Sequence, residues 1–410
     1  MSYQFTQAGL DLHEQVRRFM DSFVYPNEER YYSELEDSPD GYPPVMEKLK
    51  AAAIERGLWN LFLPELEPHH PGTKLSNVDY APISEMLGRV GFASQALNCS
   101  APDTGNMEIL HSYGTDAVKA VWLEPLLAGE IRSAFSMTEP DVASSDATNI
   151  GLRIERTDGG YVLNGRKWFS SGAASPRCKV LVVMGLTDPD APPHRRQSMV
   201  VVPIDTPGVS IGMLPSVFGY SEIGGHPEVI YRDVRIPADH LLGDEGGGFA
   251  IAQARLGPGR IHHCMRSIGV AERALELMVT RSLERHTFGS SLAHKGLIQD
   301  WIAESRIAID MAREYVMKTA YLMDTVGNKA AATEISGIKV AVPRMTLEVI
   351  DRAIQVHGAA GVTQFTPLAH MYAGTRTLRI ADGPDEVHKM TIARREIRRH
   401  QPAFRMGVGG

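Results

Sequence analysis

The chain has 410 residues, a net charge of -7 and a sequence isoelectric point near 6.1. This length exceeds what one simple hydrophobic core usually serves, so we expect two or three domains. The acidic balance argues against a nucleic-acid-binding protein, and no apolar run is long enough for a membrane span. Three widely spaced cysteines without a Cys-x-x-Cys pair favour a reducing compartment. Because no signal-peptide pattern is present, we expect the cytoplasm, or the mitochondrial matrix only if a presequence has been removed.

The residue pattern changes twice along the chain, which predicts an α+β protein with three domains. Residues 1–131 follow helical spacing, residues 132–246 contain short β-prone runs, and residues 247–410 return to helical spacing. Helices followed by a β-module and then by helices match neither a βαβ alternation nor a sandwich.

Individual elements can be predicted inside these regions. Thr115 is expected to cap a helix, and the stretch 297–323 repeats apolar residues at helical spacing without Gly or Pro. The runs 179–186, 198–204 and 228–236 are predicted strands. Asn164-Gly165 is a strong signal for a hairpin turn.

Motifs for several common chemistries are missing from the sequence. There is no GxGxxG after a strand, no GxxxxGK[ST], no HExxH and no GxSxG. The adjacent pairs His69-His70 and His262-His263 do not have metal-ligand spacing, because neighbouring side chains on a helix diverge. We therefore expect no metal site.

Four stretches in order resemble the acyl-CoA dehydrogenase family, and the resemblance extends over nearly the whole chain. They are AFSMTEPDVASSDATN (134–149), NGRKWFSSGA (164–173), RHTFGSSL (285–292) and QVHGAAGV (355–362) followed by Asp382-Gly383. The chain resembles the branch that includes the C-terminal dehydrogenase domains of family members 10 and 11. The resemblance implies an N-terminal helical domain, a middle β-barrel domain and a C-terminal four-helix bundle.

The resemblance also implies an FAD cofactor and a set of residues that bind it. Phe135, Met137 and Thr138 would border the flavin, and an aromatic and hydroxyl hairpin would pack on it. Arg285 would meet the pyrophosphate of FAD bound mainly by a neighbouring subunit, which implies a homodimer or homotetramer. The full cofactor-binding set is Phe135, Met137, Thr138, Ser144, Trp168, Phe169, Ser170, Ser171, Arg285, Phe288, Gln355, Gly358, Ala359, Pro384 and Glu386. Ser145 and Gly383 would contact the substrate, with the choice between Ser144 and Ser145 for the CoA contact left open.

Asp382 can be assigned two different roles, a helix cap or a catalytic base. Asp-Gly-Pro-Asp at 382–385 is a turn signal, so Asp382 can serve as the cap of the last helix. Counted from Gln355, the same residue stands where well-known family members carry the glutamate that removes the substrate proton. The resemblance implies Asp382 as that base, with Arg260 beside it. Aspartate is one methylene shorter, and a misplacement near 1 Å can cost about a hundredfold in rate.

The implied reaction is α,β-dehydrogenation of an acyl-CoA in fatty acid β-oxidation, with electrons passing to an electron-transfer flavoprotein. The branch resemblance adds 4-hydroxyacyl-CoA or 4-phosphoacyl-CoA as substrates beside unmodified acyl-CoA. Two alternatives remain: a flavin oxidase on the same fold, similar to the nitroalkane oxidases that use Asp at this position, and a catalytically inactive binding subunit.

Overall fold

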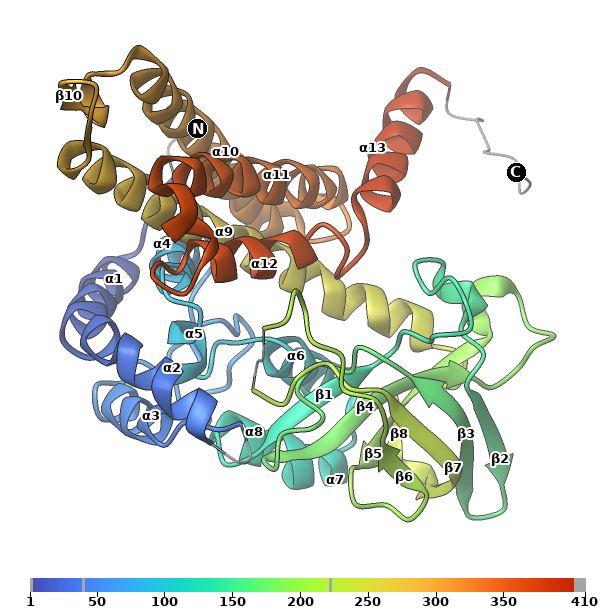
Figure 1. The fold of residues 1–410 in the computed structure, drawn as a ribbon. Helices are drawn as coiled ribbons and strands as arrows, with labels where there is room; N and C mark the ends of the chain where they lie inside the picture. Colours follow the sequence, from blue (N-terminus) through green and yellow to red (C-terminus); the bar gives the residue numbers. More distant parts are fainter. Residues whose placement is uncertain (1–2, 39–40, 221–222, 402–410) are drawn as a thin grey trace. The chain divides into compact units, whose positions relative to one another are not determined.

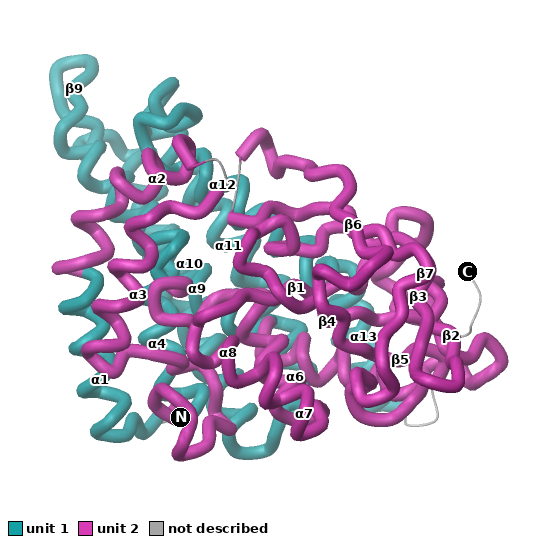
Figure 2. Tube along the Cα trace, turned by 90° about the horizontal axis from the view of Figure 1, so that it is seen from below, with its two compact units in different colours: residues 1–20, 76–93, 260–410 teal, residues 21–75, 94–259 magenta. Residues whose placement is uncertain are grey.

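The computed structural model describes residues 3–38, 41–220 and 223–401, which form two compact units. Unit 1 consists of Met1–Met20, Ser76–Ala93 and Arg260–Gly410, and unit 2 consists of Asp21–Leu75 and Ser94–Gly259 (Figure 2). The chain therefore passes between the two units several times. The three-domain division at 131/132 and 246/247 stays a prediction. It was drawn from changes in the hydrophobic pattern of the sequence, whereas these two units are defined by their compactness.

Helices make up most of unit 1 (Figure 1). They are α1 (Gln7–Phe19), α4 (Asn77–Gly88), the part of α9 (Gly248–Glu284) from Arg260 onward, α10 (Gly296–Val326), α11 (Ala332–His357), α12 (Leu368–Thr377) and α13 (Asp385–His400), with the short strands β9 (His286–Thr287) and β10 (Ser290–Ser291). The short helix α5 (Ala93–Ala96) lies at the boundary between the units. The predicted helix at 297–323 is confirmed by α10.

The helices of unit 1 pack through close approaches and apolar faces. Helix α11 packs against α10, α12 and α13, and α4 packs against α1 and α10. Gly269 brings α9 onto α4, because a Cβ atom there would lie 1.8 Å from the carbonyl oxygen of Glu85. Thr346 of α11 donates a hydrogen bond to the carbonyl of Ser267 in α9 at 3.1 Å. These contacts fix the part of α9 that carries Arg260 relative to α11 and α4.

Unit 2 combines short helices with a mixed sheet. Its helices are α2 (Glu28–Asp37), α3 (Val45–Glu55), α6 (Asp103–Tyr113), α7 (Asp116–Val118) and α8 (Glu124–Leu127). Its strands are β1 (Arg132–Ser136), β2 (Arg153–Thr157), β3 (Gly160–Lys167), β4 (Cys178–Leu186), β5 (Gln197–Pro203), β6 (Val209–Ile211), β7 (Val229–Pro237) and β8 (Leu241–Leu242). Thr115 caps α7 as predicted, with its side chain accepting from the backbone N–H of Val118.

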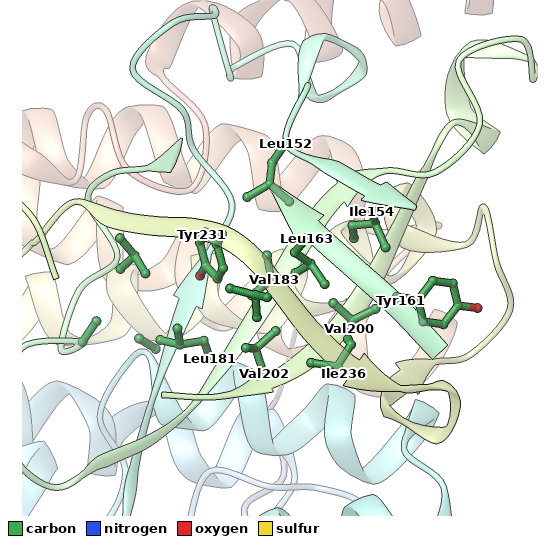
Figure 3. Close-up of a cluster of buried hydrophobic side chains, with 14 of the residues drawn as sticks. Leu152, Ile154, Tyr161, Leu163, Leu181, Val183, Val200, Val202, Tyr231 and Ile236 are labelled. Carbon is green, nitrogen blue, oxygen red and sulfur yellow. The ribbon is translucent and has the colours of Figure 1, made fainter. Parts of the chain in front are cut away.

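The sheet has the strand order β6-β7-β3-β2-β4-β5-β8, and β1 pairs in parallel with β4. Alternate residues of β3, β4, β5 and β7 point into one apolar cluster, in which Leu163, Leu181, Val183 and Val200 are fully buried (Figure 3). Pairing of β6 with β8, which would close the sheet into a barrel, is not among the pairings of the described residues. The middle region is thus a sheet domain between helical regions.

Two local predictions are wrong. Asn164-Gly165 lies inside β3, where the register against β7 shifts, and the turn of the β2–β3 hairpin is instead at 158–159. An Asn-Gly pair can serve a β-bulge as well as a turn, because glycine tolerates the irregular backbone that a bulge needs. The last helix begins at Asp385 with Pro384 at its N-cap position, so Asp382 does not cap it.

Candidate functional site

Residues 135–139 leave the end of β1 and pair with the segment that follows β3. The backbone N–H of Trp168 donates to the carbonyl of Thr138 at 3.0 Å, and the Thr138 hydroxyl donates to the carbonyl of Trp168 at 2.8 Å. The guanidinium carbon of Arg255 lies over the ring of Phe135, 3.9 Å from the ring centroid. The two sequence stretches that resemble a flavin-binding region are therefore joined directly in unit 2.

A buried ion pair holds these two stretches together. Lys167 is completely buried, and its Nζ donates to Oε1 of Glu139 at 2.7 Å and to the carbonyl of Met137 at 2.8 Å. Glu139 also accepts the backbone N–H groups of Gly151 and Leu152 at 2.9 and 2.8 Å. Burial lowers the pKa of Lys167 to about 8. The ion pair thus fixes the backbone of Met137 from inside the domain.

After β3, Ser170 and Ser171 are hydrogen-bonded to other residues, whereas the Phe169 side chain is exposed. Ser170 is buried and lies 3.1 Å from the Ser136 hydroxyl, while Ser171 lies 2.8 Å from Nδ1 of His226. Phe169 has a positive φ of 49° and is 46% exposed, with its ring edge-on to Trp168. A left-handed backbone at a large aromatic residue is uncommon and points to a functional constraint.

Ser144 and Ser145, between which the choice of a CoA contact was left open, have different surroundings in the loop 140–150. The Ser144 hydroxyl accepts the backbone N–H of Glu139 at 2.8 Å, so it belongs to the loop's own hydrogen bonding. Ser145 is exposed. The exposed residue is therefore the one whose hydroxyl can meet an external molecule.

In unit 1, the main chain around Asp382 is held by side chains from three helices. The carbonyl of Asp382 accepts from Nε of Arg260 at 2.9 Å and lies 3.2 Å from Nε2 of His388. The buried Lys339 of α11 donates to the carbonyls of Ala381, at 2.8 Å, and Leu378. Asp382 has a positive φ of 55°. Aspartate enters this left-handed region more readily than most residues with a side chain, which suits it to this position.

The start of α13 closes the same loop with charge. Oδ2 of Asp385, which is 2% exposed, accepts from Nε of Arg344 and Nε of Arg379, both at 2.9 Å. Asp385 is the first residue of α13. It also joins both ends of the loop 379–385 and connects them to α11.

The carboxylate of Asp382 faces an imidazole. Nε2 of His263 lies 3.4 Å from Oδ2 of Asp382, and the two side chains are 20% and 19% exposed. Arg260 and His263 are three residues apart on α9, so they lie on the same side of the helix. Both the backbone and the side chain of Asp382 are thus contacted from one helical turn.

The remaining expected site residues of unit 1 lie on its surface. Arg285 is exposed directly before β9, and Phe288 is 95% exposed with a φ of 47°. Gln355, Gly358 and Ala359 are exposed at the end of α11, where Gly358 has a φ of 64°. Within the described ranges, no ion pair of Arg285 is found. These residues present an accessible cation and backbone rather than packed side chains.

Known proteins match this chain over nearly its whole length. Family models for the N-terminal, middle and C-terminal domains of acyl-CoA dehydrogenase match residues 6–130, 134–234 and 246–397. The chain is 53% identical over 412 residues to the protein named "Probable acyl-CoA dehydrogenase FadE2" of Mycobacterium tuberculosis, covering 100% of both chains. The chain belongs to the acyl-CoA dehydrogenase family.

This acyl-CoA dehydrogenase family member is also similar to a vertebrate protein and to two solved bacterial structures. It is 53% identical over 400 residues to acyl-CoA dehydrogenase family member 11 of Gallus gallus, covering 96% of this chain and 51% of that relative. A solved structure from Mycobacterium abscessus matches with a TM-score of 0.94 at 47% identity, covering 97% of this chain and 100% of the other. Butyryl-CoA dehydrogenase of Megasphaera elsdenii matches with a TM-score of 0.81 at 25% identity, with the same coverage. No helix in the described part of the chain is both long and apolar enough to cross a membrane.

The structure therefore brings the predicted residues of this acyl-CoA dehydrogenase family member together in separate groups. Phe135, Met137 and Thr138 join the hairpin in unit 2, whereas Arg260, Asp382 and Gly383 join in unit 1. Pro384 follows directly, and Glu386 is exposed in the first turn of α13. Roles for Glu139, Lys167, His263, Lys339 and His388 were not predicted, because the contacts that define these roles depend on the folded backbone.

One group of histidines and acids lies apart from these residues. Ligand atoms of His69, His70 and Glu124 lie within 4.8 Å of one another. Nδ1 of His70 accepts the backbone N–H of Glu67 at 3.4 Å, so its ring proton is on Nε2, which faces Oε1 of Glu124 at 3.1 Å. The expectation that adjacent histidine side chains diverge is wrong for His69 and His70, whose ring centroids lie 4.1 Å apart outside any helix.

Gly383 limits the shape of the loop that carries Asp382. Its φ is 98°, and a Cβ atom would lie 2.9 Å from Nε2 of His388. We expect Gly383→Ala to lower the free energy of unfolding by about 1–3 kcal/mol through backbone strain, measured by urea denaturation. Gly374→Ala is the matched control, since nothing lies within 4 Å of a Cβ there and the position is helical. A loss no larger than that of the control would contradict the strained geometry.

His388 makes the stability of unit 1 depend on pH. Burial, aided by Arg260 and Lys339, lowers the pKa of His388 to about 4. Because an unfolded histidine titrates near pH 6.5, only the unfolded chain gains this proton as the pH falls from about 6.5 to about 4, so folding is progressively disfavoured. For one such histidine the loss between pH 7 and pH 5 is about 2 kcal/mol.

We expect His388→Gln, which keeps a donor for the Asp382 carbonyl but does not titrate, to flatten this part of the pH dependence. Urea unfolding of both proteins at pH 7 and pH 5 measures the difference. Equal losses between the two pH values in wild type and variant would show that His388 is not the titrating group.

Proposed function

We propose that this chain catalyses the FAD-dependent α,β-dehydrogenation of an acyl-CoA thioester to the trans-2-enoyl-CoA, as a step of fatty acid β-oxidation. The observation that carries the proposal is the Asp382 carboxylate, placed by a left-handed backbone that Arg260, His388 and Lys339 hold. A carboxylate fixed in this way suits the removal of a proton from the carbon alpha to the thioester. Family membership and the likeness to butyryl-CoA dehydrogenase support the substrate class.

The residues of unit 2 fit a flavin. The exposed ring of Phe169, held in a strained backbone, offers a flat apolar surface. The Thr138 hydroxyl donates to the carbonyl of Trp168, so it fixes the backbone beside this ring. FAD, when bound, supplies the acceptor for the hydride of the beta carbon. We assign Phe135, Met137, Thr138 and the residues 168–171 to this face, with Ser145 directed to the CoA portion and Ser144 to the loop beside the cofactor.

Arg260 and Gly383 complete the proposed catalytic region of unit 1. Arg260 fixes the carbonyl of Asp382, and Gly383 allows the substrate to approach the backbone because it has no side chain. A backbone N–H at the base position can polarise the thioester carbonyl as negative charge develops on it. Pro384 and Glu386 then line the cofactor side of the loop.

A second copy of the chain is part of the proposal. Arg285, Phe288, Gln355, Gly358 and Ala359 are exposed in this structure, and Phe288, Val362 and Phe365 are 95%, 65% and 81% exposed. Exposed apolar residues favour a protein interface, and an exposed arginine such as Arg285 can meet an anionic group there. We propose that these residues bind the FAD pyrophosphate of the neighbouring subunit in a homodimer or homotetramer.

The finer assignments follow from the relatives. From the resemblance to the branch of family members 10 and 11 we propose a 4-hydroxyacyl-CoA or 4-phosphoacyl-CoA substrate beside plain acyl-CoA. We also propose an electron-transfer flavoprotein as the acceptor and the cytoplasm as the location. One observation favours a second candidate. Aspartate at the base position is shared with nitroalkane oxidases, so oxygen consumption with a nitroalkane is the reaction to compare.

The test is an anaerobic panel in which the loss of flavin absorbance is followed after adding short, medium, long, branched and 4-hydroxylated acyl-CoAs. Bleaching with at least one acyl-CoA is the expected result. No bleaching across the panel, combined with rapid oxygen consumption on a nitroalkane, would replace the dehydrogenase with the oxidase. A protein that takes up no FAD would indicate an inactive binding subunit.

A further inference from the structure

The imidazole of His263 is held in one tautomer by its other neighbour. Nη2 of Arg266 lies 3.1 Å from Nδ1 of His263. A guanidinium can only donate, so Nδ1 must accept. A neutral ring with Nδ1 as acceptor carries its proton on Nε2, the nitrogen that faces Oδ2 of Asp382 at 3.4 Å. Arg266 therefore leaves His263 with its one ring N–H on the nitrogen nearest the Asp382 carboxylate.

The ring is neutral at ordinary pH for a physical reason. Burial lowers the pKa of His263, and the neighbouring Arg266 acts in the same direction, although the hydrogen bond to Asp382 opposes both. The charged or titratable groups around the pair come from three helices. They are Arg260, His262, Cys264 and Arg266 on α9, Lys339 on α11, and His388 on α13. Three of them, Arg260, Arg266 and Lys339, are cations.

We propose that His263 is a positioning residue for the base: its Nε2–H donates to Oδ2 of Asp382, fixes the carboxylate and directs Oδ1 toward the substrate. This inference rests on the proposed function, in which Asp382 accepts the substrate proton. When the C–H bond at the alpha carbon breaks, the proton goes to Oδ1 of Asp382 and His263 keeps its own. The electron pair of that bond remains on the substrate.

The proposal answers how an aspartate can serve where a longer glutamate is usual in the family. Arg260 holds the carbonyl of Asp382, and His263, three residues along the same helix, holds its carboxylate. A short side chain has fewer rotatable bonds, so contacts at both ends leave it little freedom. Precise orientation then compensates for the shorter reach, since misplacement of a reacting group is what slows such steps.

A pair of variants separates this role from a general structural one. In His263→Asn the side-chain oxygen can still accept from Arg266, but the amide stops short of Asp382. In His263→Gln the amide reaches the place of Nε2 and can donate to the carboxylate. We expect the anaerobic bleaching rate with acyl-CoA at pH 7 to fall about 10–100-fold in His263→Asn and to return to within about threefold of wild type in His263→Gln.

The pH profile provides the second readout. Losing a donor to the carboxylate should raise the pKa of the acidic limb of the bleaching rate in His263→Asn, so that its deficit shrinks at higher pH. Acyl-CoA affinity, from titration of the flavin spectrum, should stay within about threefold of wild type, because the change acts on the proton-transfer step. If His263→Asn loses its flavin, Arg266→Gln is measured instead, with the same limb expected to move in the same direction.

Equal rates in the two histidine variants, or an unmoved acidic limb in His263→Asn, would overturn the inference while leaving the proposed function intact. Asp382→Asn distinguishes the other failure, since wild-type bleaching in that variant would remove the base itself. In the Asp382→Asn background, adding His263→Asn should change the residual rate by less than about twofold, because coupled residues are not additive. A further large drop in the double variant would show that His263 acts independently of Asp382.

Discussion

Asp382→Asn is expected to lower the anaerobic bleaching rate with acyl-CoA by about 10²–10⁴-fold, which is the usual contribution of a general base. An amide has nearly the size of the carboxylate but cannot take up the alpha proton. The backbone contacts of Asp382 with Arg260 and His388 do not involve its side chain, so the loop should keep its shape. Flavin content and acyl-CoA affinity should therefore stay close to those of the wild type.

Stopped-flow absorbance at saturating acyl-CoA measures this rate separately from binding. Glu396→Gln is the matched control, because Glu396 is an exposed carboxylate of α13 that pairs only with neighbours on the same helix in the described structure. The control should bleach at the wild-type rate. If Asp382→Asn bleaches as fast as the control, Asp382 is not the base and the proton acceptor lies elsewhere.

Lys167→Met is expected to have the largest effect on stability. The ammonium of Lys167 is completely buried against Glu139, and its removal leaves a buried carboxylate without its counter-charge. Breaking such a pair by removing one partner typically costs about 3–5 kcal/mol. The carbonyl of Met137 loses a donor in the same variant, so the backbone beside the proposed flavin should loosen and the purified protein should retain less FAD.

Urea unfolding and the ratio of flavin to protein absorbance check both effects. Lys179→Met is the control, since Lys179 lies exposed on β4 and loses only a surface charge. The double variant Glu139→Gln/Lys167→Met should be less destabilised than Lys167→Met, because it removes the unpaired charge and keeps one oxygen acceptor. A single variant as stable as the control would mean that the ion pair contributes little.

The sequence could predict what depends on local pattern. The helix at 297–323, the strands around 180 and 200, and the cap at Thr115 follow from periodicity and capping chemistry. The hairpin turn predicted at Asn164-Gly165 is wrong, because the same two residue types occur in turns and in β-bulges. Pairing of this segment with β7 makes it a bulge. Asp382 misled as a cap because tertiary contacts from Lys339 and Arg260, rather than helix capping, fix the loop.

The candidate site was predictable only as a set of positions, through the family resemblance. The partner of Asp382 was not, because His263 lies 119 residues earlier and nothing in its local sequence marks it. The same holds for Lys167, whose lysine type suggests a surface residue although it is buried against Glu139.

The double ion pair of Asp385 has a consequence for how this protein can change during evolution. Arg379 and Asp385 close a ring of seven residues that is tied to α11 by Arg344, so the number of residues between them is fixed by the distance that the side chains can span. One inserted or deleted residue would change that span, whereas exchange of the Asp382 side chain would leave both ion pairs of Asp385 in place. A change in the length of this loop therefore requires compensating changes at Arg344 or Arg379.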